Sequence, residues 1–211
     1  MNKNTSNEII TLLRKIIINP QCELNYNNNF ELLCAVMLSA QTTDKRVNMV
    51  TPHLFLKYPD PYSLANASIS DVKDIIKELG LASNKAKNLI ELSKILYSDY
   101  DSIVPDSLIE LTKLPGVGRK TASVVLSVGF KKPSMPVDTH IYRMAIRLGY
   151  VKKNASVLDA ELALKKYIPI SDWIDAHHLL LLFGRYYCKA INPSCNGCVL
   201  IGYCKNKNKN L

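Results

Sequence analysis

The sequence LPGVGRKTA at residues 114–122 decides the fold, because two helical segments meet there across a pair of glycines. Upstream, the pattern from Asp106 predicts a helix that ends at Leu114-Pro115, with Ser107 and Glu110 at the spacing of a capping box. A second helix is expected from Gly118 to Val128. We therefore predict a helix-hairpin-helix over about residues 106–128.

The two glycines of this hairpin carry the first functional hint. Glycine lets the backbone turn sharply and approach a ligand closely. Free amides at the start of the second helix would form a site for an anion such as a DNA phosphate. The same residues would also be expected in a plain antiparallel helix turn, which needs glycine only for its geometry. The glycine pattern alone leaves both interpretations open.

The rest of the chain also has helical periodicity. An opening helix is closed by Asn19-Pro20, and residues 58–61 are expected to form a turn. No segment alternates strictly enough to predict a strand, so we expect an all-α fold. A domain boundary is plausible near Lys131-Lys132-Pro133. The remaining predicted helices cover residues 30–38, 45–57, 70–79, 83–97, 139–148, 155–166 and 173–188.

Composition restricts the class of protein. The formal charge of +9 is concentrated after residue 133 and would attract a polyanion, although a solvated basic surface explains it equally well. No apolar run has the length of a membrane span, and the first 20 residues lack the features of a signal peptide. We expect a cytoplasmic protein.

Lys120 and Asp138 are the candidate catalytic residues. Lys120 follows the hairpin, where the positive end of the helix dipole and partial burial would favour the neutral, nucleophilic amine. Such an amine can attack a sugar C1′ and form a Schiff base, whereas an ordinary lysine would only pair with phosphate. Asp138 precedes a helix and could be its N-cap, a carboxylate that stabilises a cationic sugar, or both.

Four clustered cysteines predict a metal centre near the C-terminus. Their spacing is C-x6-C-x2-C-x5-C, and in a chain without an export signal such thiols favour metal binding over disulfides. The spacing alone is compatible with zinc or with an iron–sulfur cluster. Cys34 is expected to be an ordinary buried residue, and Cys22 is given no role. The four cysteines are Cys188, Cys195, Cys198 and Cys204.

Residues 114–122, together with Val137-Asp138-Thr139-His140, resemble the endonuclease III branch of the helix-hairpin-helix DNA glycosylases. Matching positions extend back to residues 38–44 and on through the four cysteines. The resemblance implies a six-helix domain at 22–132 and a second domain made of 1–21 and 133–211. DNA would bind in the cleft between them, and the cysteine loop at 188–204 would hold a [4Fe–4S] cluster.

The resemblance also implies roles for individual residues. Lys120 would be the nucleophile and Asp138 the catalytic carboxylate. Gln41 would fill the space left by an extruded nucleotide, and Leu81 would wedge between base pairs. A helix-end glutamine and a core leucine are the alternatives. The roles of Ser39, Asp44 and His140 stay open. Further DNA contacts are expected from Gly116, Val117, Gly118, Arg119 and Lys189.

Together these features predict a monomeric base-excision repair enzyme that acts on duplex DNA. It would remove oxidised or ring-saturated pyrimidines and cleave the strand 3′ to the abasic site by β-elimination. An adenine-mismatch glycosylase of the same superfamily is the first alternative, but that branch lacks the lysine and carries a further C-terminal domain. The second alternative is a non-enzymatic iron–sulfur protein that binds DNA or transfers electrons.

Overall fold

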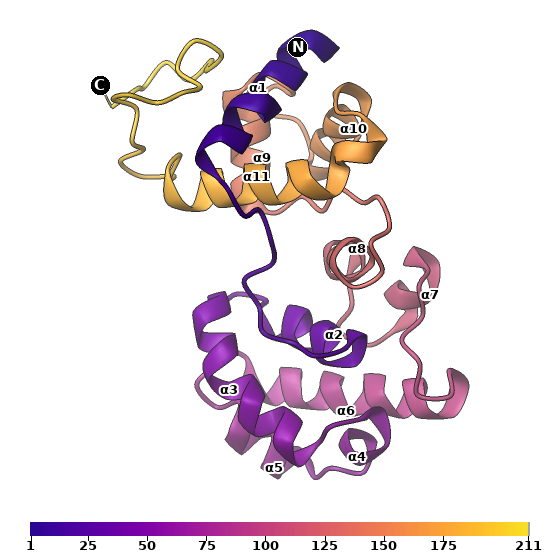
Figure 1. The fold of residues 1–211 in the computed structure, drawn as a ribbon. Coiled ribbons are helices and arrows are strands. Elements are labelled where there is room, and N and C mark those ends of the chain that lie inside the picture. The colour runs from indigo at the N-terminus through magenta and orange to yellow at the C-terminus, as the bar shows by residue number, and fades with distance from the viewer. Residues whose placement is uncertain (211) are drawn as a thin grey trace. The chain divides into compact units, whose positions relative to one another are not determined.

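A computed structural model describes residues 1–210, and all regular secondary structure in that range is helical (Figure 1). The predicted all-α fold is therefore confirmed. The α-helices are α1 Lys3–Ile16, α2 Asn29–Leu38, α3 Asp44–Lys57, α4 Pro61–Ala65, α5 Ile69–Ile75, α6 Ala82–Asp99, α7 Leu108–Lys113, α8 Arg119–Val128, α9 Thr139–Arg147, α10 Val157–Tyr167 and α11 Trp173–Tyr186, with a short 3-10 helix at Ile170–Asp172.

The chain divides into two compact units. One joins Met1–Cys22 to the part that begins at Lys132, and the other is the continuous segment Glu23–Lys131. We call them the terminal unit and the middle unit. The domain predicted at 22–132 differs from the middle unit by one residue at each end. The middle unit contains α2 to α8, which is one helix more than the six expected.

The additional helix is α4, at a place where the sequence predicted only a turn. Asp60 caps its first turn in a capping box with Ser63, and Pro61 stands at the first helical position. Proline at that position has its φ angle already set for a helix and needs no hydrogen-bonded N–H. The residues that indicated a turn are therefore the ones that start this short helix.

The middle unit is organised around α2, which is buried on every side. Each residue from Phe30 to Leu38 is buried, and α2 contacts α3, α6 and α8. A helix that is apolar all round requires such a central position. Its one buried carboxylate, Glu31, accepts hydrogen bonds from the backbone N–H of Asn27 at 2.7 Å and from its side chain at 3.0 Å. Burial raises the pKa of the Cys34 thiol, which is the inert core residue expected.

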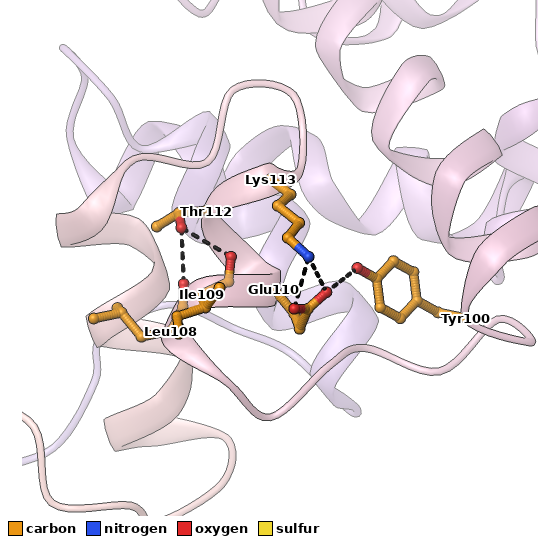
Figure 2. A network of polar contacts seen from close by, with 6 residues as sticks. All are labelled: Tyr100, Leu108, Ile109, Glu110, Thr112 and Lys113. Carbon is orange, nitrogen blue, oxygen red and sulfur yellow. Dashed lines mark hydrogen bonds and ion pairs between the residues drawn. The ribbon is translucent and has the colours of Figure 1, made fainter.

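The capping box predicted at the start of α7 is wrong. Ser107 is the N-cap but its side chain makes no cap hydrogen bond. The Glu110 carboxylate instead accepts from Lys113 Nζ at 2.8 Å and from the Tyr100 hydroxyl at 2.7 Å (Figure 2). Two donors from outside the cap therefore compete successfully for this side chain, and α7 begins at Leu108 rather than at Asp106.

The terminal unit is built from both parts of the chain. In this unit α11 lies against α1 and α9, and α10 packs on α9 (Figure 1). Ile9, Ile10 and Leu13 give α1 a buried face, and the Ser6 hydroxyl hydrogen-bonds the Tyr150 hydroxyl at 2.7 Å in the core. A Cβ at Gly184 of α11 would lie 3.1 Å from the His140 carbonyl oxygen, so α11 and α9 approach closely there.

No helix within residues 1–210 is both long enough and apolar enough to cross a membrane.

We expect Leu33→Ala to lower the free energy of unfolding by about 2–5 kcal/mol, because Leu33 is fully buried in α2 and truncation leaves a cavity. Leu56→Ala, at an 86% exposed position of α3, should change that free energy by less than about 0.5 kcal/mol. Urea unfolding followed by circular dichroism compares the two variants. Equal midpoints would contradict the central role of α2.

Candidate active site

The hairpin between α7 and α8 is a tight turn that only glycine fits at one position. Val117 N–H donates to the Leu114 carbonyl at 3.1 Å, and Gly116 has a φ of +76°. A Cβ on Gly116 would lie 2.9 Å from both Met37 Sδ of α2 and Asn88 Nδ2 of α6. The Val117 side chain is buried, so a contact of Val117 with DNA would involve its backbone.

The start of α8 leaves backbone amides without partners. Gly118 is the N-cap and supplies no side-chain hydrogen bond, and Ala122 N–H is the first to bond back, to the Gly118 carbonyl at 3.0 Å. The amides of Gly118, Lys120 and Thr121 have no acceptor among residues 1–210. Unsatisfied amides at the positive end of a helix favour an anion. A Cβ on Gly118 would meet nothing within 4 Å, so this end of α8 is open to a ligand.

Lys120 is the second residue of α8 and is exposed, so the expected partial burial is wrong. Its Nζ makes no hydrogen bond or ion pair with any residue that the structure describes. The Lys120 amine is therefore exposed near the start of α8, and no ion pair within the described residues competes for it.

Asp138 is the N-cap of α9, as one of the sequence interpretations predicted. Its Oδ1 accepts from Ile141 N–H at 2.8 Å, and the residue is half-buried. No hydrogen bond to its Oδ2 is seen within the described chain, and the charge of the carboxylate interacts with that of Arg143 in the same helix. The preceding segment is held by His177, whose Nδ1 lies 3.0 Å from the Pro136 carbonyl oxygen. Asp138 belongs to the terminal unit and Lys120 to the middle unit.

Gln41 and Leu81 share an unusual backbone geometry. Gln41 has a φ of 58° in the turn after α2, and Leu81 has a φ of 63° at the N-cap of α6. The left-handed region is unfavourable for residues other than glycine, and such residues concentrate at functional sites. Both side chains are exposed, with Leu81 at 55%. The alternative that Leu81 is a core leucine is therefore wrong, and Gln41 lies in the turn rather than at the helix end.

Two residues whose roles were left open bond locally. The Ser39 hydroxyl donates to the Val36 carbonyl at 2.7 Å at the end of α2. His140 Nδ1 accepts from Arg143 Nη2 at 3.2 Å in the first turns of α9. Neither contact assigns these residues to a pocket.

Two arginines of α9 fasten the cysteine loop to the terminal unit. Arg147 Nη1 donates to Cys188 Sγ at 3.1 Å and to the Lys189 carbonyl at 2.8 Å. Arg143 donates to the Cys188 carbonyl at 3.0 Å and to the Gly184 carbonyl at 2.6 Å. The Lys189 side chain is exposed. The first cysteine is therefore held in place by α9, while the lysine beside it points into solvent.

The four loop cysteines are half-buried free thiols that lie near one another. Burial raises the pKa of Cys198, and the charges of Cys188, Cys195 and Cys204 add to that effect. No three His, Cys, Asp or Glu residues within positions 1–210 are arranged to hold a single metal ion. Clustered thiolates are ligands for zinc or for an iron–sulfur cluster.

Comparison with known proteins identifies the family. Residues 34–169 match the model of the HhH-GPD superfamily base excision DNA repair proteins. The chain belongs to this superfamily. The matched residues include the hairpin and Asp138, and they end before the cysteine loop.

Relatives of similar length extend the likeness over the loop as well. Endonuclease III of Bacillus subtilis (strain 168) is 48% identical over 189 residues, which is 90% of this chain and 86% of the relative. Endonuclease III of Escherichia coli (strain K12) is 41% identical over 209 residues, 99% of each chain. The structure of a trapped endonuclease III–DNA covalent intermediate has a TM-score of 0.94 at 43% identity and covers 97% of this chain and 96% of that one. The resemblance to the endonuclease III branch is therefore confirmed.

Sequence reasoning missed one residue of this HhH-GPD protein. Lys85 of α6 is buried, and its Nζ donates to the Ala40 carbonyl at 2.8 Å, next to Gln41. A lysine three residues into a helix gives no sequence signal for such a contact. The one available signal was its spacing, because Lys85 lies four residues, or one helical turn, after Leu81, the candidate wedge.

The two hairpin glycines should respond differently to substitution. Gly116→Ala should lower the free energy of unfolding by about 1–2 kcal/mol, because alanine is strained at positive φ. Gly118→Ser should leave it within about 0.5 kcal/mol of the parent value, since serine is a favoured N-cap and has open space there. Urea midpoints measure both. Equal losses would show that the turn does not depend on the left-handed glycine.

Proposed function

We propose that the chain is a DNA N-glycosylase and abasic-site lyase that removes oxidised or ring-saturated pyrimidines from duplex DNA. The observation that carries the proposal is the unpaired Lys120 amine beside the uncapped start of α8. The similarity to an endonuclease III trapped as a covalent DNA intermediate supports it. The enzyme would act as a monomer on DNA in the cytoplasm, associated with the nucleoid.

The hairpin would hold the DNA strand by its backbone. A phosphate accepting hydrogen bonds from the amides of Gly118, Lys120 and Thr121 would satisfy donors that have no acceptor among residues 1–210. Gly116 forms the tight turn, Gly118 places no side chain beside that phosphate, and Arg119 adds a positive charge at the same end of α8. Phosphate contacts fix position along the strand and carry no sequence information.

Lys120 would carry the covalent chemistry. Its neutral amine attacks C1′ of the sugar, and the bond to the base breaks with its electron pair on the base, which is protonated as it leaves. Loss of the remaining N–H proton opens the sugar to a Schiff base. Removal of a C2′ proton then expels the 3′ phosphate, which is the β-elimination step. The amine is regenerated when water hydrolyses the imine.

Asp138 would contribute through the oxygen that the helix cap does not use. A carboxylate near C1′ stabilises the positive charge that develops on the sugar as the base departs, as in glycoside hydrolysis. It can also accept the proton that Lys120 must lose before attack. The cap hydrogen bond to Ile141 fixes the orientation of the carboxylate for either task.

Gln41 and Leu81 would replace the extruded nucleotide. Extrusion breaks stacking and pairing at a cost of a few kcal/mol, and side chains that fill the space recover part of it. Both residues are exposed on left-handed turns of the middle unit, a geometry that supports insertion better than packing. Gln41 offers an amide to the unpaired base, and Leu81 offers an apolar wedge.

Cys188, Cys195, Cys198 and Cys204 would hold a [4Fe–4S] cluster. Their number, spacing and nearness fit four thiolate ligands, and the similarity to endonuclease III favours the cluster over zinc. When bound, the cluster would order a loop that has little apolar surface of its own. Lys189, exposed beside Cys188, would then contact the DNA backbone. The rival of a purely electron-transferring DNA-binding protein gives no reason for the unpaired Lys120.

The covalent step is tested with borohydride. Wild-type protein should form a reduced, trapped adduct with an oligonucleotide duplex that carries one oxidised pyrimidine, and should nick an abasic duplex. Lys120→Ala should abolish trapping and nicking, since it removes the amine. Lys113→Ala, an exposed lysine of α7, is the matched control and should trap like the wild type. Undiminished trapping by Lys120→Ala would overturn the assignment.

Asp138→Asn refines the same experiment. Asparagine caps helices as well as aspartate does, so the fold should be retained while the charge is lost. Excision should fall by roughly 10²–10⁴-fold if the carboxylate acts as proposed. Excision equal to wild type would reduce Asp138 to a helix cap.

The cofactor is tested on purified protein. We expect a brown protein with broad visible absorption and about four irons and four acid-labile sulfides per chain. Cys198→Ser should lose the colour and destabilise the cysteine loop. A colourless protein with one zinc per chain would refute the cluster.

A further inference from the structure

One face of α6 touches every loop of the middle unit that carries a proposed DNA contact. Leu81, at the start of the helix, is the proposed wedge. Lys85, one turn later, bonds the Ala40 carbonyl beside Gln41 at 2.8 Å. Asn88, in the next turn, lies under Gly116 of the hairpin, where a Cβ would approach its Nδ2 to 2.9 Å. Positions spaced by four and three residues lie on one helix face.

Lys85 joins two of these loops through its own atoms. Its backbone N–H donates to the Leu81 carbonyl at 3.0 Å, and its Nζ donates to the Ala40 carbonyl. The Ala40 carbonyl belongs to the peptide plane that also contains the Gln41 nitrogen. Rotation of that plane changes the φ of Gln41, which is 58°. The lysine therefore fixes the plane that sets the left-handed conformation of Gln41.

Core packing does not explain a lysine at this position. Lys85 is 5% exposed, and no carboxylate within residues 1–210 pairs with it. Desolvation alone lowers its pKa. Burying an ammonium that has only a carbonyl as its partner is unfavourable compared with burying a methionine of similar length. We therefore look for a role of Lys85 other than stabilising the fold.

We propose that Lys85 is a positioning residue that sets the Gln41 and Leu81 loops at a fixed spacing before DNA binds. This inference rests on the proposed function of those two side chains. The left-handed turns at Gln41 and Leu81 are held at this spacing by the first turn of α6 and by the hydrogen bond from Lys85 to Ala40. The two side chains are therefore preorganised. The conformational entropy of these two loops is then lost when the protein folds, so their ordering does not add to the free-energy cost of nucleotide extrusion.

The first test uses the full chain without DNA. Lys85→Met keeps the apolar stem and removes the donor, and Lys87→Met, at an exposed position of α6, is the matched control. Hydrogen exchange followed by mass spectrometry should show faster exchange in peptides covering 39–43 and 80–84 for Lys85→Met alone. Unchanged exchange in both peptides would overturn the tether, whether or not the protein is a glycosylase.

The second test separates positioning from general damage. In single-turnover reactions, Lys85→Met should slow excision of an oxidised pyrimidine from duplex DNA by about tenfold or more, because small misplacements are costly in catalysis. Strand cleavage at a preformed abasic site should stay within about twofold, since no base has to be extruded there. Lys87→Met should match the wild type in both reactions.

The outcomes of the second test are distinguishable. Equal excision by Lys85→Met and Lys87→Met, or a parallel loss of both reactions in Lys85→Met, would overturn the positioning role. A wild-type protein that excises no base would refute the proposed function, and the exchange experiment would still decide the tether. If Lys85→Met does not fold, Lys85→Gln removes the charge and shortens the reach, and the same split is expected.

Discussion

The burial of α2 on all sides is the constraint on which the middle unit depends. A helix that has no solvent face must be surrounded, and α3, α6 and α8 surround it. Two glycines beyond the ends of α8 allow the approach of α2. A Cβ at Gly129 would lie 2.9 Å from Leu32 Cδ2, and one at Gly116 would lie 2.9 Å from Met37 Sδ. The packing that stabilises the core therefore also positions the hairpin and the turn that carries Gln41.

The helix starts differ in how their first turns are capped. Most helices begin with a side chain that bonds the first turn, such as Asn28 of α2, Thr43 of α3 and Ser156 of α10. The starts of α6, α7, α8 and α11 have no such bond, but only α6 and α8 among these four begin with an N-cap residue, Leu81 or Gly118, whose side chain has no oxygen to offer. An omitted cap leaves amides for a ligand. Asp138 combines both cases, because one of its oxygens caps α9 and the other has no partner in the described chain.

The features that could be predicted from the sequence are those that local patterns determine. Helical periodicity located most elements, the glycines of residues 114–122 predicted the hairpin, and cysteine spacing indicated a metal loop. It failed where a tertiary partner competes. Glu110 bonds Tyr100 and Lys113 instead of capping α7. The burial expected for Lys120 is also wrong, because exposure depends on packing that no local pattern contains. The contact of Lys85 with Ala40 joins residues 45 positions apart, which no local pattern contains.

The composition of the terminal unit from both parts of the chain has a consequence for biosynthesis. The middle unit is continuous in sequence, so it can fold as soon as its residues leave the ribosome. Helix α1 is made before its partners, because Tyr150, Asp175 and Tyr203 follow 144, 161 and 195 residues after the residues they bond. Its apolar face of Ile9, Ile10 and Leu13 therefore stays without its partners until those later residues have been synthesised.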